Sequence, residues 1–253
     1  ACGNHSFRQD SFGTERIEEQ LEELFPKARI ARMDIDSVRG KHSHDHLILE
    51  FEARRIDILV GTQMVVKGLD FEHVDLVGIL DADNLLSFAD FRVHERAFQL
   101  MEQVSGRAGR KADQGQVLIQ TTQVKHPVLH CVQDHDYARF FELEIQGRQK
   151  FLYPPFSRLL KLTCKHTSRE LAEEASTYLA NRLKSEYGSW LVGPAEPVVP
   201  RVRNQYLMEL LLKLPRDRKV IEKAKRMILD SIGLMHQLPR LKNVVVVPDA
   251  DPV

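Results

Sequence analysis

Two arginines lie three residues apart in the stretch QVSGRAGRKADQGQVLIQT, which covers residues 103–121. Arg107 and Arg110 each follow or flank a glycine, and glycine lets the backbone come close to a ligand. The planar fork of arginine matches phosphate oxygens and keeps its charge at any ordinary pH. These residue types therefore predict that the two arginines bind phosphate. Such a site usually includes a phosphate-binding loop. The sequence contains no G-x-x-x-x-G-K-[ST] motif, so this loop is missing from it.

A second stretch suited to nucleic acid, ILVGTQMVVKGLDF, covers residues 58–71. Backbone amides and the Thr62 hydroxyl at the end of a strand, with Gln63 beside it, suit contacts to nucleic-acid phosphates. Gly68 allows close approach of the backbone, and Asp70 could accept a hydrogen bond from a ribose hydroxyl or hold an arginine. Taken alone, the stretch is equally compatible with an ordinary strand-to-helix loop.

The elements that must position these stretches alternate between helix and strand. Thr14 is expected to cap a helix whose apolar stripe is Ile17, Leu21, Leu24 and Phe25. Short apolar runs typical of strands occupy residues 30–33, 56–60, 74–80 and 117–120, and helices are expected at about 43–54 and around 97–104. This order predicts an α/β domain, a parallel sheet covered on both faces, with functional residues at the carboxyl ends of its strands.

The second half of the chain predicts a smaller α+β domain. A helical stretch at about 127–150 leads to YPPF, followed by a strand at 159–165, a helix at 168–187, two strands flanking a turn at 203–205, a helix at about 217–235 and a strand at 243–247. The order βαββαβ resembles the ferredoxin-like layout. Basic charge gathers here, because residues 201–242 hold 11 Lys and Arg against 4 Asp and Glu.

Composition limits the class of protein. The chain has 253 residues, 43% of them hydrophobic and 28% charged, which is ordinary for a soluble protein. Its net charge of zero argues against a uniformly basic coat for nucleic acid, although not against a local one. Apolar runs fall far short of a membrane span and no signal peptide is evident, so we expect a cytoplasmic protein without membrane contact.

The two stretches together resemble motifs V and VI of superfamily 2 helicases in their order and spacing. Further segments narrow the resemblance to the PriA family (primosomal protein N-prime), bacterial DNA helicases that restart stalled replication forks: GTERIEEQLEELFP, ILVGTQMVVKGLDFEHVDLVGILDADNLL, ADFRVHERAFQLMEQVSGRAGR and DADP. The resemblance covers nearly the whole chain. It implies that residues 13–122 form the second RecA-like lobe of an ATP-dependent 3′–5′ DNA helicase, 123–150 a helical connector and 151–253 the C-terminal α+β domain.

The resemblance implies a nucleotide site on this lobe. Arg107 and Arg110 would reach the γ-phosphate of ATP, and Gln103 would help to position nucleotide or water. Gly68 and Asp70 are expected on the nucleotide-binding side of the neighbouring motif. ATP and Mg would bind between this lobe and a first lobe that carries the phosphate-binding loop. The position of that loop on the first lobe explains its absence from this sequence. The chain alone is therefore expected to be inactive as an ATPase.

The resemblance also implies a DNA contact and a zinc site. Thr62 and Gln63 would touch the DNA strand along which the motor moves. Residues 1–12 would be the remnant of a cysteine-rich zinc-binding insertion, with Cys2 as one stranded ligand. Zinc is then expected in the full-length protein and not in this chain, because one cysteine cannot supply the four ligands that zinc prefers.

Partner binding is expected on the basic C-terminal domain. The helix that begins near Asp217 carries Arg216, Arg218 and Lys219 at its start, and its amino end together with these side chains would favour an anionic partner. The family implies forked, branched or single-stranded DNA, the acidic tail of single-stranded DNA-binding protein, and other primosome proteins. The alternative is a solvated basic face without a partner.

Other chemistry-bearing residues have simpler interpretations. Asp81 and Asp83 end a strand, where we expect them to cap a loop. Phe88, Phe91 and Phe98 could stack on bases, but their spacing favours core packing.

Two other functional classes remain open. One is a non-enzymatic DNA-binding module, in which Arg107 and Arg110 merely hold nucleic acid. The other is the second lobe of a RecG-like fork-remodelling translocase, against which the GTER helix, GTQM and DADP argue.

Overall fold

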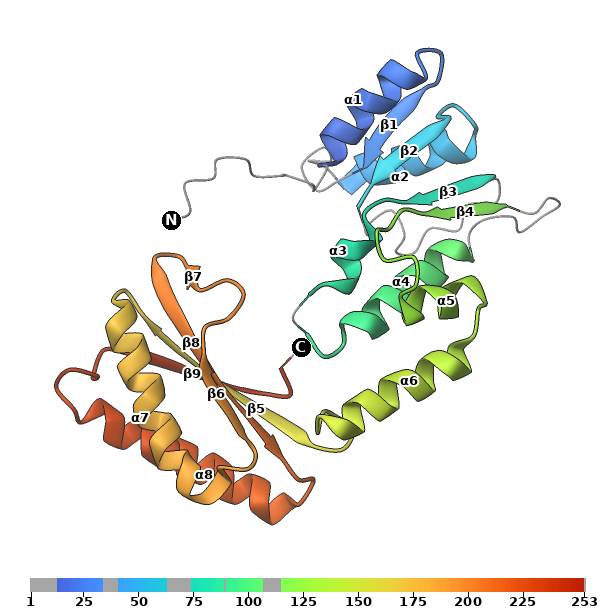
Figure 1. Cartoon of the computed structure of the whole chain (residues 1–253). Helices are drawn as coiled ribbons and strands as arrows, with labels where there is room; N and C mark the ends of the chain where they lie inside the picture. Colours follow the sequence, from blue (N-terminus) through green and yellow to red (C-terminus); the bar gives the residue numbers. More distant parts are fainter. Residues whose placement is uncertain (1–12, 34–40, 63–73, 89, 107–114, 253) are drawn as a thin grey trace. The chain divides into compact units, whose positions relative to one another are not determined.

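The computed structural model of the chain describes residues 13–33, 41–62, 74–88, 90–106 and 115–252 (Figure 1). These residues form two compact units. The first unit contains the described residues up to 88 together with 92–140, and the second contains 90–91 together with 141–252. Helix α6 (Tyr137–Lys150) begins in the first unit and continues into the second.

The first unit alternates helices and strands, as predicted. Its other elements are α1 (Thr14–Leu24), β1 (Ile30–Met33), α2 (Lys41–Glu52), β2 (Ile58–Gly61), β3 (Leu76–Ile79), α3 (Ala82–Leu86), α4 (Val93–Ser105), β4 (Gln116–Ile119) and α5 (Pro127–Gln133). The expectation that Thr14 caps α1 is wrong. Gly13 is the N-cap, and its carbonyl accepts the first helical hydrogen bond, from the Ile17 amide (3.2 Å), which leaves Thr14 inside the helix.

The strands of the first unit pair in parallel, as predicted for this half. β1 pairs with β2 and β3 pairs with β4. Within the described residues no ladder joins one pair to the other, so they form two two-stranded sheets. The β3–β4 pair also has an uncovered face, since Leu76 and Leu118 are 54% and 59% exposed.

The core of the first unit lies where α4 packs against α5 and the start of α6. Its buried members are Leu86, Ala97, Phe98, Met101, Val128, Leu129, Cys131, Val132 and Phe140. Phe98 stacks on Phe140 with ring centroids 4.2 Å apart and planes 7° from parallel. Phe98 thus packs in the core as expected. Phe88 does not, because it lies beyond the end of α3 and is 63% exposed.

The second unit has the predicted α+β architecture. Its elements are β5 (Arg158–His166), α7 (Arg169–Tyr187), β6 (Leu191–Ala195), β7 (Arg201–Val202), β8 (Gln205–Leu214), α8 (Arg218–His236) and β9 (Val245–Ala250). The sheet order is β6-β8-β5-β9, and each neighbouring pair is antiparallel. This is the ferredoxin-like order.

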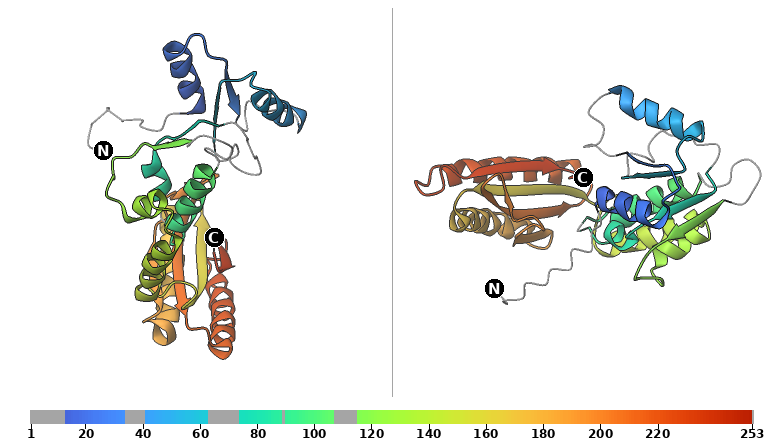
Figure 2. Two further views of the ribbon diagram at one scale, coloured as in Figure 1. Left: turned by 90° about the vertical axis from the view of Figure 1, so that its right-hand side faces the viewer. Right: turned by 90° about the horizontal axis from the view of Figure 1, so that it is seen from above.

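Helices α7 and α8 lie side by side along the sheet (Figures 1 and 2). Side chains along β8 alternate between the two faces of the sheet, as strand geometry requires. Met208, Leu210, Leu212 and Leu214 are buried in the core that the helices share, whereas Lys213 points to the other face. Alanines on α7 and α8 belong to this core, and their small side chains allow close helix packing.

The second strand of this fold is β6, which the sequence pattern does not mark. The strand expected before the turn at 203–205 is only the two-residue β7, which pairs with β8. Gly193 has a positive φ of 97° inside β6, and a Cβ atom there would lie 2.7 Å from the Glu209 carbonyl oxygen. Glycine is required at such a position, and it weakens the local strand signal.

Candidate functional site

Helix α4 directly precedes Arg107 and Arg110 in the sequence. Ala97, Phe98, Met101 and Val104 form its buried face, and Gln103 lies on the exposed face near its end. The helix ends at Ser105, where the Gly106 amide donates to the Glu102 carbonyl (2.9 Å). The predicted catalytic pair Arg107 and Arg110 lies outside the described residues.

Of the predicted DNA-contacting and nucleotide-contacting residues in the stretch 58–71, the structure describes Thr62. It is exposed and directly follows β2, at the carboxyl end of a parallel strand. Functional residues of parallel sheets collect at such ends. Gln63, Gly68 and Asp70 lie outside the described residues, as does Cys2.

Asp81 and Asp83 stabilise the loop after β3, as expected. Asp81 adopts a left-handed conformation (φ 53°, ψ 54°) and its carboxylate accepts the Asn84 amide at the start of α3. Asp83 accepts hydrogen bonds from the Thr121 hydroxyl (2.5 Å), the Thr122 amide (2.7 Å) and the Thr122 hydroxyl (2.6 Å). These donors favour the carboxylate and lower the pKa of Asp83 to about 2. The clamp ties the residues after β4 to α3.

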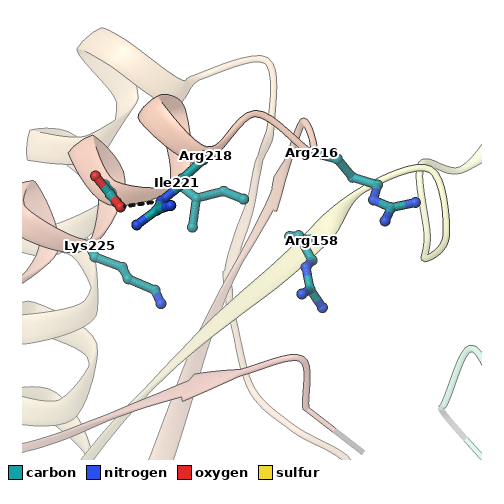
Figure 3. A pocket seen from close by; sticks show the side chains of 6 residues that line it. Arg158, Arg216, Arg218, Ile221 and Lys225 are labelled. Atoms are coloured by element: carbon teal, nitrogen blue, oxygen red, sulfur yellow. Dashed lines mark hydrogen bonds and ion pairs between the residues drawn. The ribbon is translucent and has the colours of Figure 1, made fainter.

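The second unit holds a basic hollow of about 370 Å³. It is lined by Arg158, Arg216, Arg218, Ile221, Glu222 and Lys225, so the structure brings two of the three predicted partner-binding residues together. Figure 3 shows that the lining comes from β5, from the connection between β8 and α8, and from α8 itself. Two further basic residues, Arg158 and Lys225, join the predicted ones.

The third predicted residue, Lys219, lines an adjoining hollow of about 280 Å³ with Glu222, Lys223 and Arg226. Glu222 borders both hollows and pairs with Arg218 (2.9 Å), and Lys223 pairs with Glu186. In the part of the chain that the structure describes, Lys219 and Lys225 make no ion pair. The surface therefore presents positive charge that is only partly neutralised.

The amino end of α8 contributes less than expected. Asp217 is its N-cap, and its carboxylate accepts the amides of Lys219 (2.7 Å) and Val220 (3.2 Å). A capping carboxylate satisfies the amides that an anion would otherwise bind and adds negative charge. The capped amides leave the side chains as the main source of positive charge at this end of α8.

The described residues show neither a metal site nor a membrane span. Among them, no three His, Cys, Asp or Glu side chains gather as metal ligands would. No helix in the described ranges is long and apolar enough to cross a membrane.

Comparison with known proteins assigns each unit. Residues 9–112 match the family described as "Helicase conserved C-terminal domain", and residues 149–253 match "Primosomal protein N C-terminal domain". The first unit is therefore a helicase C-terminal lobe, and it is followed in the same chain by a primosomal C-terminal domain.

Whole-chain relatives narrow the class further. The replication restart protein PriA of Treponema pallidum is 41% identical over 255 residues, which span 100% of this chain and 37% of the relative. The PriA proteins of Synechocystis sp. and Bacillus subtilis are 40% and 37% identical over 92% and 90% of this chain, and each is covered over 29% of its length. This chain belongs to the PriA family. It spans about a third of the length of the curated relatives it matches.

The Asp83 clamp predicts an acid that stays ionised at unusually low pH. Its folded-state pKa of about 2 lies below the ordinary value, so its contribution to stability is fully present above pH 4 and disappears as the pH falls through 2. Carboxyl-carbon NMR should find Asp83 still ionised at pH 3. Thr122→Val should raise its pKa, because one hydroxyl donor is lost. An ordinary Asp83 titration near pH 4 in the parent would show that the clamp does not form.

Proposed function

We propose that this chain supplies the second motor lobe and the C-terminal domain of an ATP-dependent 3′–5′ DNA helicase that recognises stalled or branched replication forks and restarts replication through primosome assembly. The observation that carries the proposal is the succession of a helicase C-terminal lobe and a primosomal C-terminal domain in one chain. Whole-chain similarity to replication restart proteins supports it.

ATP and Mg are proposed to bind between this lobe and a first lobe that carries the phosphate loop. Gln103 lies on the exposed face of α4, where it is accessible to nucleotide or water. Arg107 and Arg110, which follow α4 in the sequence, would stabilise the charge that develops on the transferring phosphoryl group. Gly68 and Asp70 would complete this face of the site. The chain alone would hydrolyse no ATP, since its sequence lacks the phosphate loop.

The DNA contacts are proposed to come from the residues that follow β2 in the sequence. Thr62 is exposed at the end of that strand, which suits a contact to a backbone phosphate, and Gln63 follows it. The full-length protein would also hold zinc in its cysteine-rich insertion, with Cys2 as one ligand. A role in replication implies a cytoplasmic protein.

The basic hollow is proposed to bind anionic partners. Arg216, Arg218 and Lys219 would attract the acidic tail of single-stranded DNA-binding protein and the phosphates of branched DNA. The charge of the hollow supports this, because only Glu222 among its lining residues is acidic. Other primosome proteins are further expected partners.

Substitution of Arg107 or Arg110 is predicted to abolish catalysis with little loss of DNA binding. Arg107→Ala or Arg110→Ala in the full-length enzyme should lower the DNA-stimulated ATPase rate by about 10³- to 10⁵-fold, the range known for arginine fingers. Arg110→Lys should recover little, because lysine keeps the charge and loses the fork. Steady-state ATPase assays and nucleotide-free DNA titrations measure both effects. If the alanine variants hydrolyse ATP normally but no longer bind DNA, these arginines contact nucleic acid and not the nucleotide.

The basic hollow predicts weak, salt-sensitive binding by the 253-residue chain. Its affinity for forked DNA and for an acidic tail peptide should fall steeply with salt. Arg216→Ala should lower the slope of log affinity against log salt for DNA by about 1, the effect of one lost phosphate contact. Lys242→Ala, which removes an exposed charge beyond the far end of α8, serves as the matched control. Binding that does not change with salt concentration would contradict the proposal that the hollow binds anionic partners. Equal slopes for both variants and the parent would contradict it as well.

A further inference from the structure

A tight hairpin at residues 197–206 lies at the start of β8 in the second unit. Its strands are β7 and the first residues of β8, with Val202 paired to Gln205. The two residues of the turn, Arg203 and Asn204, have positive φ values of 47° and 64°, as a type I′ turn requires. Figure 1 shows β7 and the loop before it beside this end of β8. The tip of this β7–β8 hairpin therefore has a defined backbone geometry.

The hairpin exposes three valines within five residues. Val198 is 79% exposed, Val199 58% and Val202 45%. Among the residues that the structure describes, the apolar core of the second unit includes none of them. Apolar side chains that gather on a surface mark an interaction site, whereas isolated ones carry no such meaning. Pro197 and Pro200 lack amide donors, so an added β-strand is a poor partner for this segment.

The charge of the hairpin is entirely positive. Arg201 and Arg203 are exposed, and residues 197–206 contain no Asp or Glu. Glu196, which directly precedes the hairpin, pairs with Arg169 of α7 (2.9 Å). Within the described part of the chain, the Arg203 guanidinium forms no hydrogen bond and no ion pair. An anionic partner would therefore meet a cation that no protein carboxylate neutralises.

The aromatic ring of the hairpin is not free to stack on a base. The Arg201 guanidinium lies 5.0 Å from the centre of the Tyr206 ring, and the same guanidinium donates to Asn204 Oδ1. Tyr206 also packs against the core of the unit. Proteins that bind single-stranded nucleic acid use exposed aromatic rings on which bases stack. Exposed arginines and valines without a free ring instead suit the phosphates and sugars of a duplex, whose bases are already stacked.

We propose that the β7–β8 hairpin binds duplex DNA, with Arg203 on a backbone phosphate and Val198 and Val199 against the sugars. The choice of DNA as the anionic partner rests on the proposed function. The contact is separate from the basic hollow, because Arg216 follows β8 and the hairpin precedes it, about 30 Å away along the ten residues of the strand. A two-stranded ribbon is also narrow enough to enter the major groove of a duplex.

The test measures how tightly the 253-residue chain binds a blunt DNA duplex and a single strand of the same length, over a series of salt concentrations. Arg203→Gln should lower the slope of log affinity against log salt for the duplex by about 1, the effect of one lost phosphate contact. The double variant Val198→Ser, Val199→Ser should weaken duplex binding about fivefold at every salt concentration, because it loses apolar contact area. Its slope should equal that of the parent, since no phosphate contact is lost. Single-strand affinity should change less than about twofold in both.

Lys184→Gln is the matched control for the charge. Lys184 is exposed and lies on α7 fifteen residues beyond Arg169, or about 22 Å from the residue that contacts the base of the hairpin. This variant should keep the duplex slope of the parent. Thermal unfolding should give the same midpoint for all variants, because each changed side chain is exposed.

Three results would overturn the hairpin contact. The first is a parent-like duplex affinity and slope in both hairpin variants, and the second is an equal loss of duplex and single-strand binding. The third is a serine variant that keeps its DNA affinity but loses self-association in sedimentation, because the valines would then contact a second copy of the chain. Arg216→Ala judges the basic hollow separately, so the hairpin can fail while the salt-sensitive binding expected from the proposed function remains.

Discussion

The stacking of Phe98 on Phe140 is the contact on which the packing of α4 against α6 depends. The rings lie 4.2 Å apart in the cluster where α4, α5 and the start of α6 bury their apolar faces. Such a pair adds stability beyond the area it buries. Because this contact fixes which side of α4 faces inward, it also fixes Gln103 on the opposite, exposed side. The core of the lobe thereby orients the helix that precedes Arg107 and Arg110 in the sequence.

In the C-terminal unit, one strand serves both the core and the polar surface. Leu210 and Leu212 of β8 lie in the core with α7 and α8, and the alternation of the strand then places Lys213 on the other face, beside Tyr153. Arg216 follows the end of the same strand and lines the basic hollow. Shifting the register of β8 by one residue would exchange these roles. The burial of leucines is therefore what positions the cations.

Helices and strands whose apolar residues repeat with a clear period could be predicted from the sequence, because burial of one face dominates their energetics. β8 and α4 are examples. No local signal marks β6, since its glycine and proline disfavour a strand and only pairing with β8 defines it. The stacking of Phe91 on Tyr153 could not be predicted for a similar reason: the two residues are far apart in the chain, so no local spacing records their contact. The residue types of the basic hollow were predictable, but the contribution of Arg158 from β5 required the fold.

The proposed function makes this chain one face of an ATP-driven motor and not a passive DNA-binding module. The most direct test is the dissociation constant of the full-length protein for forked DNA, measured with and without a non-hydrolysable ATP analogue. A motor couples the two ligands, so the constants should differ by about fivefold or more. Equal constants, with the analogue shown to be bound, would contradict the claim.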